Sequence, residues 1–401
     1  MTENAHGSDD TATGGDAAPG TASGHATEAT ATAAPPSRLR RLLRSRTART
    51  ATVAAVVGAL LGAGTVAWRT DTLPLVSGHA PCWDSFDEDT MKGLFGDRET
   101  RVEEQVLEND GNARGMTWGE CRITSYDGDR IRRRVNVDVH RLDGLYGTDG
   151  HRWPREFLTS WAVPLGEGLP GMASGERAWI ALPEGCTGVV GEFEAAAVVD
   201  VSMGMGRDHP SAYEEEDRAD LTRAVVAAAN GVMRDFGCSG TYRTPDRLPA
   251  VPERGPVSAT SFCGIKGLKR PAGTDKSLTW TRTNGDGGPV RVCEAGYESL
   301  GASIRLTTVV DRGLVDLFGK DVLKGGSGVD GPKGYGKVNA TRAVYRARCQ
   351  TGPVVFMVEQ DRPLYDDAAR LTRELLPAFV EAEAERIGCG PETVKGRTGR
   401  S

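Results

Sequence analysis

The sequence predicts an α+β protein: a disordered N-terminal tail, one transmembrane helix, and two tandem duplicated modules, each an antiparallel sheet with a long C-terminal helix. Three observations favour this fold class: segments that alternate apolar and polar residues, two similar amphipathic helices, and eight cysteines in two groups of four. The 401 residues divide into a disordered cytoplasmic tail (1–37), a basic juxtamembrane segment (38–50), a transmembrane helix (51–68), a tether (69–81), module 1 (82–238), a linker (239–258), module 2 (259–390) and a tail (391–401).

The region before the modules predicts a single-pass signal anchor in the cell membrane. Residues 1–37 contain too few large apolar side chains to form a core. Six arginines in 38–50 precede 18 uncharged residues, 51–68, and such a helix spans about 27 Å of the bilayer. Arginines on this side predict a cytoplasmic N-terminus and extracytoplasmic modules.

The same region leaves two further hypotheses. Small residues before Trp68 (Thr-Val-Ala) also suit a cleaved signal peptide, although the preceding leader is long for that class. Gly58 and Gly62 form a G-x-x-x-G motif, which predicts a weak homodimer through the transmembrane helix.

The cysteines predict disulfides in an oxidising compartment. All eight lie between Cys82 and Cys389, and none precedes the tether. No C-x-x-C pair is present, so a metal site or free thiols are the less favoured alternatives.

Two stretches of similar sequence indicate the duplication. LTRAVVAAANGVMRDFGC (221–238) is followed about 150 residues later by LTRELLPAFVEAEAERIGC (371–389). Lys-Gly-Leu occurs near the start of each module, and the linker 239–258 holds four prolines. The alternative is two unrelated domains with the same biased composition. The cysteines occur in the same order in both modules: Cys82, Cys121, Cys186 and Cys238, then Cys263, Cys293, Cys349 and Cys389.

Local patterns place the main elements of module 1. Two strand-like runs around Asp127-Gly128 predict a hairpin. In its second strand Val135, Val137 and Val139 share one face and His140 lies on the other. Further strands are expected at 177–182 and 195–203, a short helix near 86–95 and a long amphipathic helix at 214–236, which module 2 repeats.

Four cysteines per module allow three pairings each. The late cysteines follow the last helix, and the natural partners are the strand-borne Cys186 and Cys349, because they precede the strand that leads into that helix. We favour Cys186–Cys238 and Cys349–Cys389, which leaves Cys82–Cys121 and Cys263–Cys293.

Cys82, Trp118 and Cys121, with an early helix, a twisted sheet and a late helix, carry a resemblance. Module 1 resembles the Cys-paired α+β domains of actinobacterial membrane-anchored or lipoprotein envelope proteins of unknown function. Module 2 lacks the equivalent tryptophan and has Pro289 there. The resemblance implies a location in the envelope and no catalytic residue.

Motifs for known chemistries are missing or incomplete. The chain has no G-x-S-x-G and no H-E-x-x-H. Residues 326–331 match G-x-G-x-x-G, but Pro332 and a Gly-Tyr-Gly follow where a dinucleotide site needs the start of a helix. Residues 331–338 resemble a P-loop, but Val338 replaces the serine or threonine. We therefore expect a flexible Gly/Lys loop at 321–337.

The remaining candidates favour surface roles. Acids at 84–90 and 214–217 suit helix starts better than calcium binding. The arginines of 130–134 suit a solvated strand edge, with an anionic wall polymer or lipid as the alternative. The module histidines are expected on the surface: His79, His140, His151 and His209.

These observations predict a membrane-anchored extracytoplasmic binding or scaffold protein of the cell envelope, without catalytic, cofactor or metal residues. The expected partners are the membrane, through 51–68, and an envelope protein or wall polymer. A net charge of −6 argues against nucleic acid. The alternative function is a hydrolase of envelope material with its site in module 1.

Overall fold

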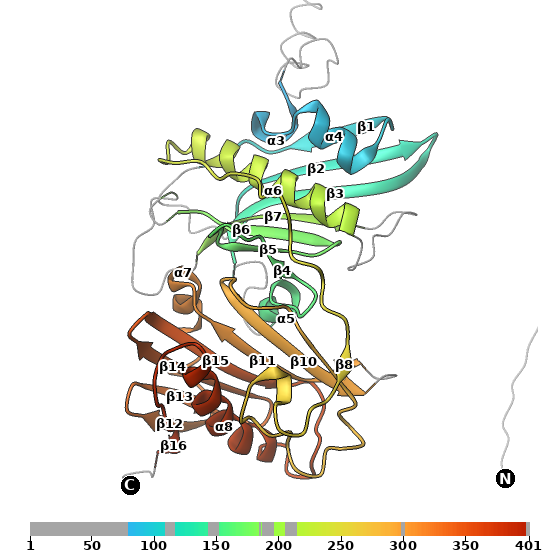
Figure 1. Ribbon diagram of the computed structural model, residues 1–401. Coiled ribbons are helices and arrows are strands. Elements are labelled where there is room, and N and C mark those ends of the chain that lie inside the picture. The colour runs from blue at the N-terminus through green and yellow to red at the C-terminus, as the bar shows by residue number, and fades with distance from the viewer. Residues whose placement is uncertain are drawn as a thin grey trace, which may run out of the picture. The chain divides into compact units, whose positions relative to one another are not determined.

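Module 1 is built on an antiparallel sheet with its long C-terminal helix on one face (Figure 1). The computed structural model describes residues 79–108, 117–142, 152–183, 186, 196–204, 215–297 and 301–397. The seven strands follow the order β1-β2-β3-β7-β6-β5-β4, and all neighbours are antiparallel. Their bounds are β1 Thr100–Glu104, β2 Thr117–Asp127, β3 Arg130–Arg141, β4 Val163–Pro164, β5 Gly171–Ala173, β6 Arg177–Ala181 and β7 Ala197–Gly204.

The long helix α6 (Glu215–Asp235) covers this sheet because its apolar stripe meets strands β5 to β7. Acids fill its first turn, where the helix dipole favours them. Leu221, Val225 and Val232 are fully buried, and each such side chain contributes about 1.5–3 kcal/mol. The shorter helices are α3 Pro81–Asp84, α4 Glu88–Phe95 and α5 Trp153–Phe157.

Module 2 repeats this order of strands. Its nine-stranded antiparallel sheet runs β16-β12-β13-β14-β15-β11-β10-β9-β8. Without the outermost strands β8 and β16, β9 takes the place of β1, β10 of β2, and so on to β12 in the place of β4. The strands are β8 Gly255–Pro256, β9 Trp280–Thr283, β10 Val290–Tyr297, β11 Gly301–Val309, β12 Ser327–Gly331, β13 Gly334–Val338, β14 Arg342–Cys349, β15 Gly352–Gln360 and β16 Lys395–Gly396.

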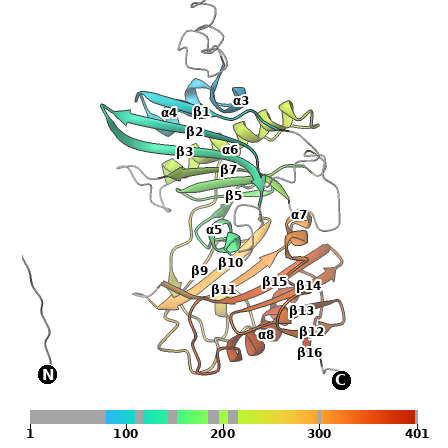
Figure 2. The same ribbon diagram turned by 180° about the vertical axis from the view of Figure 1, so that it is seen from behind.

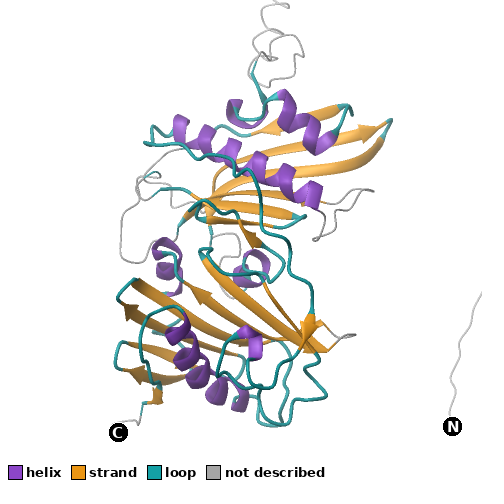
Figure 3. Cartoon of the chain, in the orientation of Figure 1, coloured by secondary structure: helices purple, strands orange, loops and turns teal. Residues whose placement is uncertain are grey.

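Helix α8 (Arg370–Arg386) covers the second sheet over β14 and β15, as α6 covers the first. Figure 3 shows the two long helices on faces of the sheets that are turned away from each other. The short helices of module 2 are η2 Phe262–Gly264, α7 Arg312–Val315 and η3 Asp316–Phe318.

The two long helices also end in the same way. Gly237 and Gly388 adopt φ of +68° and +73°, the left-handed conformation that glycine accepts without strain. The next residue then donates its N–H back into the last turn: Cys238 N to Met233 O at 2.8 Å, and Cys389 N to Ala384 O at 2.8 Å. The repeated Gly-Cys ending is therefore a helix stop followed by a cross-link.

The prediction of disulfides is confirmed. The described cysteines form Cys82–Cys121, Cys186–Cys238, Cys263–Cys293 and Cys349–Cys389, and none is free. These are the partners that the sequence favours. In each module one bridge ties the entry segment to a strand, β2 in module 1 and β10 in module 2. The other ties the end of the long helix to the turn after β6 in module 1 and to the end of β14 in module 2.

The faces of the two sheets that the long helices α6 and α8 leave free, called the helix-free faces below, share a third apolar core. It joins Trp179 and Val198 of the first sheet to Val292 and Met357 of the second. Figure 2 shows α5 and α7 lying between the sheets. Trp153 of α5 contacts Phe318 of η3 with ring centroids 5.3 Å apart. The two modules therefore pack against each other through an apolar core to which both contribute.

The fold-class prediction is wrong in its transmembrane helix as far as the described residues go. None of their helices is long and apolar enough to cross a membrane. Even α6, with 21 residues, carries Glu215, Asp220 and Arg223, charges that a bilayer core does not accept without large cost. The predicted span 51–68 and the segments before it lie outside the described residues. The described chain is α+β, with two antiparallel sheets and few helices.

The expected loop at 321–337 is also wrong, because most of it forms the hairpin of β12 and β13. A Cβ atom at Gly334 or Gly336 would lie 2.0 or 2.1 Å from a carbonyl oxygen of β14. These glycines therefore permit close strand packing, which composition alone does not distinguish from flexibility.

Candidate functional site

The structure separates the residues that the sequence offered as candidates. His79 is exposed, with Nδ1 3.0 Å from Asp84 Oδ2. His151 and His209 lie outside the described residues. Asp87 caps α4 by accepting from Thr90 N at 2.8 Å, and the acids of 215–217 form the first turn of α6. The helix-start interpretation therefore accounts for the described acids at both places.

The arginine run 130–134 is only partly a solvated strand edge. Its residues open β3, which pairs with both β2 and β7. Arg133 is largely buried, where Nη1 donates to Leu94 O at 3.0 Å and lies 2.9 Å from Asp217 Oδ1. This arginine fixes α4 and α6 to the sheet.

His140 is fully buried, so the surface prediction is wrong for it. Nδ1 donates to Arg141 O at 2.7 Å, and Nε2 lies 4.0 Å from Asp200 Oδ2. Burial lowers the pKa of His140 to about 4. Alternation placed this residue on the polar face of β3, but Phe157 of α5 packs against the His140 ring, with ring centroids 5.7 Å apart.

Carboxylates converge beside His140. Asp138 and Asp200 are paired across β3 and β7. Burial raises the pKa of Asp138 to about 6, and the charge of Glu120 adds to this. Burial raises the pKa of Asp200 to about 7 and outweighs the Arg177 guanidinium, whose Nη1 lies 2.8 Å from Asp200 Oδ2.

This cluster is a poor catalytic centre for the hydrolase alternative. Asp200 and His140 are almost fully buried, and neither lines either of the two pockets described below, so neither is placed to touch a substrate. Among the described residues, no group of His, Cys, Asp or Glu could hold a metal ion.

A more accessible site lies where the linker passes between the modules. A cleft of about 720 Å³ is lined by the N-terminal end of α6, by residues 250–254 of the linker and by Arg282 of β9. Figure 1 follows the linker from the end of α6 to β8 at the edge of the second sheet. Three arginines and two glutamates line the cleft: Arg218, Arg254, Arg282, Glu215 and Glu253.

Arg218 is the unusual member of this set. Its side chain is 2% exposed, yet within the described chain its nearest acid is Glu215, at 4.0 Å, and Glu215 is 88% exposed. Its Nε is buried and has no hydrogen-bond partner there. Burial lowers the pKa of the Arg218 guanidinium below its usual range, and Glu215 offsets this only in part. A buried cation with an unused Nε donor is costly, and a bound anion would remove that cost.

The other two arginines lie against aromatic rings. Arg254 places its guanidinium 4.2 Å from the centroid of Trp280. Arg282 stacks over Trp161 at 4.9 Å, and its Nε donates to Ser160 Oγ at 2.7 Å. Stacking on an aromatic ring orients each guanidinium.

Arg282 is also the first member of a charge row across the second sheet. Each member of the row is the direct cross-strand partner of the next, and positive and negative charges alternate. The row lies on the helix-free face of the sheet. Each member is at most 6% exposed. Arg305 Nη2 lies 2.9 Å from Glu294 Oε1, and Ser160 of module 1 donates to Glu294 Oε2 at 2.7 Å. The charge row consists of Arg282, Glu294, Arg305, Glu359 and Arg342.

Comparison with models of known protein families, with curated proteins and with solved structures finds no match. The site therefore has to be interpreted from its own geometry.

Sequence reasoning missed the cleft. Arg218 follows the acids of 214–217 and looks like one more charge on an exposed helix face. The available signal was its position in the first turn, where a cation opposes the helix dipole. Neither the burial of Arg218 nor its nearness to β9 could be obtained from local pattern.

Proposed function

We propose that this protein is an extracytoplasmic binding protein whose cleft between the modules holds the anionic group of a ligand. The observation that carries the proposal is Arg218: a buried guanidinium in the cleft wall, with no acceptor for Nε among the described residues. Carboxylate and phosphate are the groups that a guanidinium binds best.

The ligand that we propose is small or presents a single anionic end. Glu215 and Glu253 stand at the same cleft, and the net charge of the chain is −6. Both features disfavour a long polyanion. A free metabolite and the charged end of an envelope polymer share the required chemistry.

The extracytoplasmic location is part of the proposal. Four disulfides support an oxidising compartment. Blocking thiols in intact cells before lysis tests this: all eight cysteines should resist alkylation until a reductant is added. Alkylation of the cysteines without reductant would contradict the location.

Calorimetric titration of the full chain tests the binding. Inorganic phosphate and acetate serve as separate probes, and the one that binds more tightly names the class of anion. Arg218→Met should weaken binding roughly 10- to 100-fold, because a charge-assisted hydrogen bond is lost. Arg247→Gln, an exposed change in the linker outside the cleft, is the control and should have no effect.

Stability distinguishes this role from a structural one. Arg218→Met should leave the free energy of unfolding unchanged or raised, because it removes a buried charge without a close partner. A fall of several kcal/mol would mean that Arg218 stabilises the fold, and the proposal would then fail. An activity screen on ester, peptide and glycoside substrates belongs beside the titration, and turnover that depends on a cleft side chain would favour the hydrolase.

A further inference from the structure

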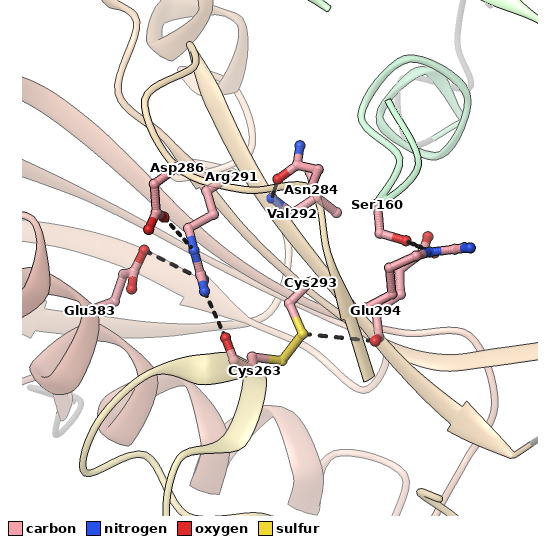
Figure 4. Close-up of a disulfide and its surroundings, with 10 residues drawn as sticks. Ser160, Cys263, Asn284, Asp286, Arg291, Val292, Cys293, Glu294 and Glu383 are labelled. Atoms are coloured by element: carbon pink, nitrogen blue, oxygen red, sulfur yellow. Dashed lines mark hydrogen bonds and ion pairs between the residues drawn. A yellow bond between two sulfur atoms is a disulfide. The ribbon is translucent and has the colours of Figure 1, made fainter. Parts of the chain in front are cut away.

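A second pocket, of about 290 Å³, lies in module 2 away from the cleft. Its wall combines the loop between β9 and β10, the end of β11 and the end of α8. Figure 4 shows the arrangement beside the Cys263–Cys293 disulfide, with Arg291 directed between Asp286 and Glu383.

Two arginines in this pocket share two acids unequally. Arg386 binds the fully buried Glu383 through two hydrogen bonds, Nε to Oε2 at 2.6 Å and Nη2 to Oε1 at 2.7 Å. Thr308 donates to the same carboxylate at 2.8 Å. Arg291 Nη1 lies 4.0 Å from it. Glu383 therefore neutralises one positive charge and is held within the protein.

The second positive charge of the arginine pair is balanced by Asp286, which is exposed, whereas Glu383 is buried. Asp286 Oδ1 accepts from Arg291 Nε at 3.0 Å and from Arg386 Nη1 at 2.8 Å. Asp286 is 68% exposed, so the pair contributes only about 0–1 kcal/mol to stability. Asp286 Oδ1 thus lies where both guanidinium groups converge, although the Asp286 side chain is mostly exposed to solvent.

The loop that carries Asp286 is held by hydrogen bonds at its start and has glycines on both sides of Asp286. Asn284 fixes the base, since its Oδ1 accepts from Val292 N at 2.8 Å. Gly285 and Gly287 flank Asp286 with φ of +91° and +85°. Glycine accepts many backbone conformations at little cost, so Asp286 can leave the arginines without disturbing the strands.

We propose that this pocket is an anion-binding site in which the Asp286 carboxylate stands in for the ligand. A phosphate or carboxylate group displaces Asp286 and accepts hydrogen bonds from Arg291 Nε and Arg386 Nη1. Glu383 stays in place and keeps Arg386 oriented. Burial lowers the pKa of Arg291, and the nearby acids only partly offset it, in keeping with a guanidinium that gains from an added anion. The site is independent of the cleft that contains Arg218.

Asp286→Asn is the decisive variant, because it removes the competing charge and leaves both arginines. It is made in the full chain together with Arg218→Met, so that the cleft does not contribute. Titration with inorganic phosphate, and separately with acetate, should give an affinity about tenfold higher than in the chain with Arg218→Met alone. The tighter probe identifies the class of anion.

The matched control is Asp330→Asn, which removes an exposed aspartate that pairs with Arg397 elsewhere in module 2. It should leave the affinity unchanged. Adding Arg386→Gln to the Asp286→Asn chain should reverse the gain. If Asp286→Asn fails to raise the affinity for either probe while the chain stays folded, the proposal is overturned.

Discussion

The first sheet has a row of cross-strand partners, here called the equivalent row, on the strands that correspond to those of the charge row in the second sheet. Arg122 follows the disulfide residue Cys121 as Glu294 follows Cys293. Glu294 is 1% exposed, whereas Arg122 is 40% exposed. The equivalent row consists of Glu103, Arg122, Asn136, Ser202 and Arg177.

The difference teaches what burial demands of polar residues. Module 1 lays Ser160 and Trp161 over the charge row, and every charge there has an opposite charge beside it. The equivalent row includes the neutral residues Asn136 and Ser202. A buried charge needs partners because water no longer solvates it, and a half-exposed row does not.

Breaking the charge row at its centre should have the largest effect. Glu294→Ala leaves Arg282 and Arg305 buried without their shared carboxylate, and it should lower the free energy of unfolding by about 3–5 kcal/mol. Arg122→Ala, at the equivalent position, should cost less than about 1 kcal/mol. Urea unfolding of both variants checks the contrast, and equal losses would contradict it.

Removing the Ser160 hydroxyl that contacts the charge row should have an intermediate effect on the free energy of unfolding. Ser160 donates to Glu294 and accepts from Arg282, each at 2.7 Å. Ser160→Ala should therefore cost about 1.5–3 kcal/mol. Ser202→Ala in the equivalent row is the matched control and should change stability by less than about 0.5 kcal/mol. The comparison fails if the two serines prove interchangeable.

The buried ionisable groups on the helix-free face of the first sheet should make the free energy of unfolding depend on pH. The folded-state pKa of Asp200, about 7, lies above its ordinary value of 3.8. Protonated Asp200 therefore stabilises the fold, and this contribution is lost as the pH rises through 7. Asp138 acts in the same direction up to about 6. His140, lowered to about 4, acts in the opposite direction and loses its contribution as the pH falls.

Comparison with Asp200→Asn isolates the part due to Asp200. The unfolding free energy of the wild type, relative to that of the variant, should fall by on the order of 1–2 kcal/mol between pH 5 and pH 7. Asp246→Asn, at an exposed position, is the control and should show no such trend. A relative stability that rises over this range would contradict the burial of Asp200.

The helix ends should show no difference between modules. Gly237→Ala and Gly388→Ala each force a side chain into the left-handed conformation, at a cost of about 1 kcal/mol. Thermal unfolding should give similar shifts for both. A loss at only one helix would show that the common ending is not equally important in the two modules.

Several parts of the fold could be predicted from sequence because they depend on local pattern. Alternation around Asp127-Gly128 predicted the hairpin of β2 and β3. The apolar stripe, the acids and Gly237 predicted α6 to within a residue or two. Local pattern could not predict that Arg218 is buried, because its burial depends on β9 and the linker.

The sequence by itself indicated the hairpin of β2 and β3, strands β6 and β7, and the ends of the long helices, since each depends on periodicity or on neighbours along the chain. Only the tertiary structure decided which polar residues are buried. His140 lies on a strand face that alternation marks as polar, whereas Glu294 shares its face of β10 with Val290 and Val292. Both are buried where the faces opposite the long helices meet. That contact joins residues more than 100 positions apart, such as Ser160 and Glu294, and no local pattern specifies it.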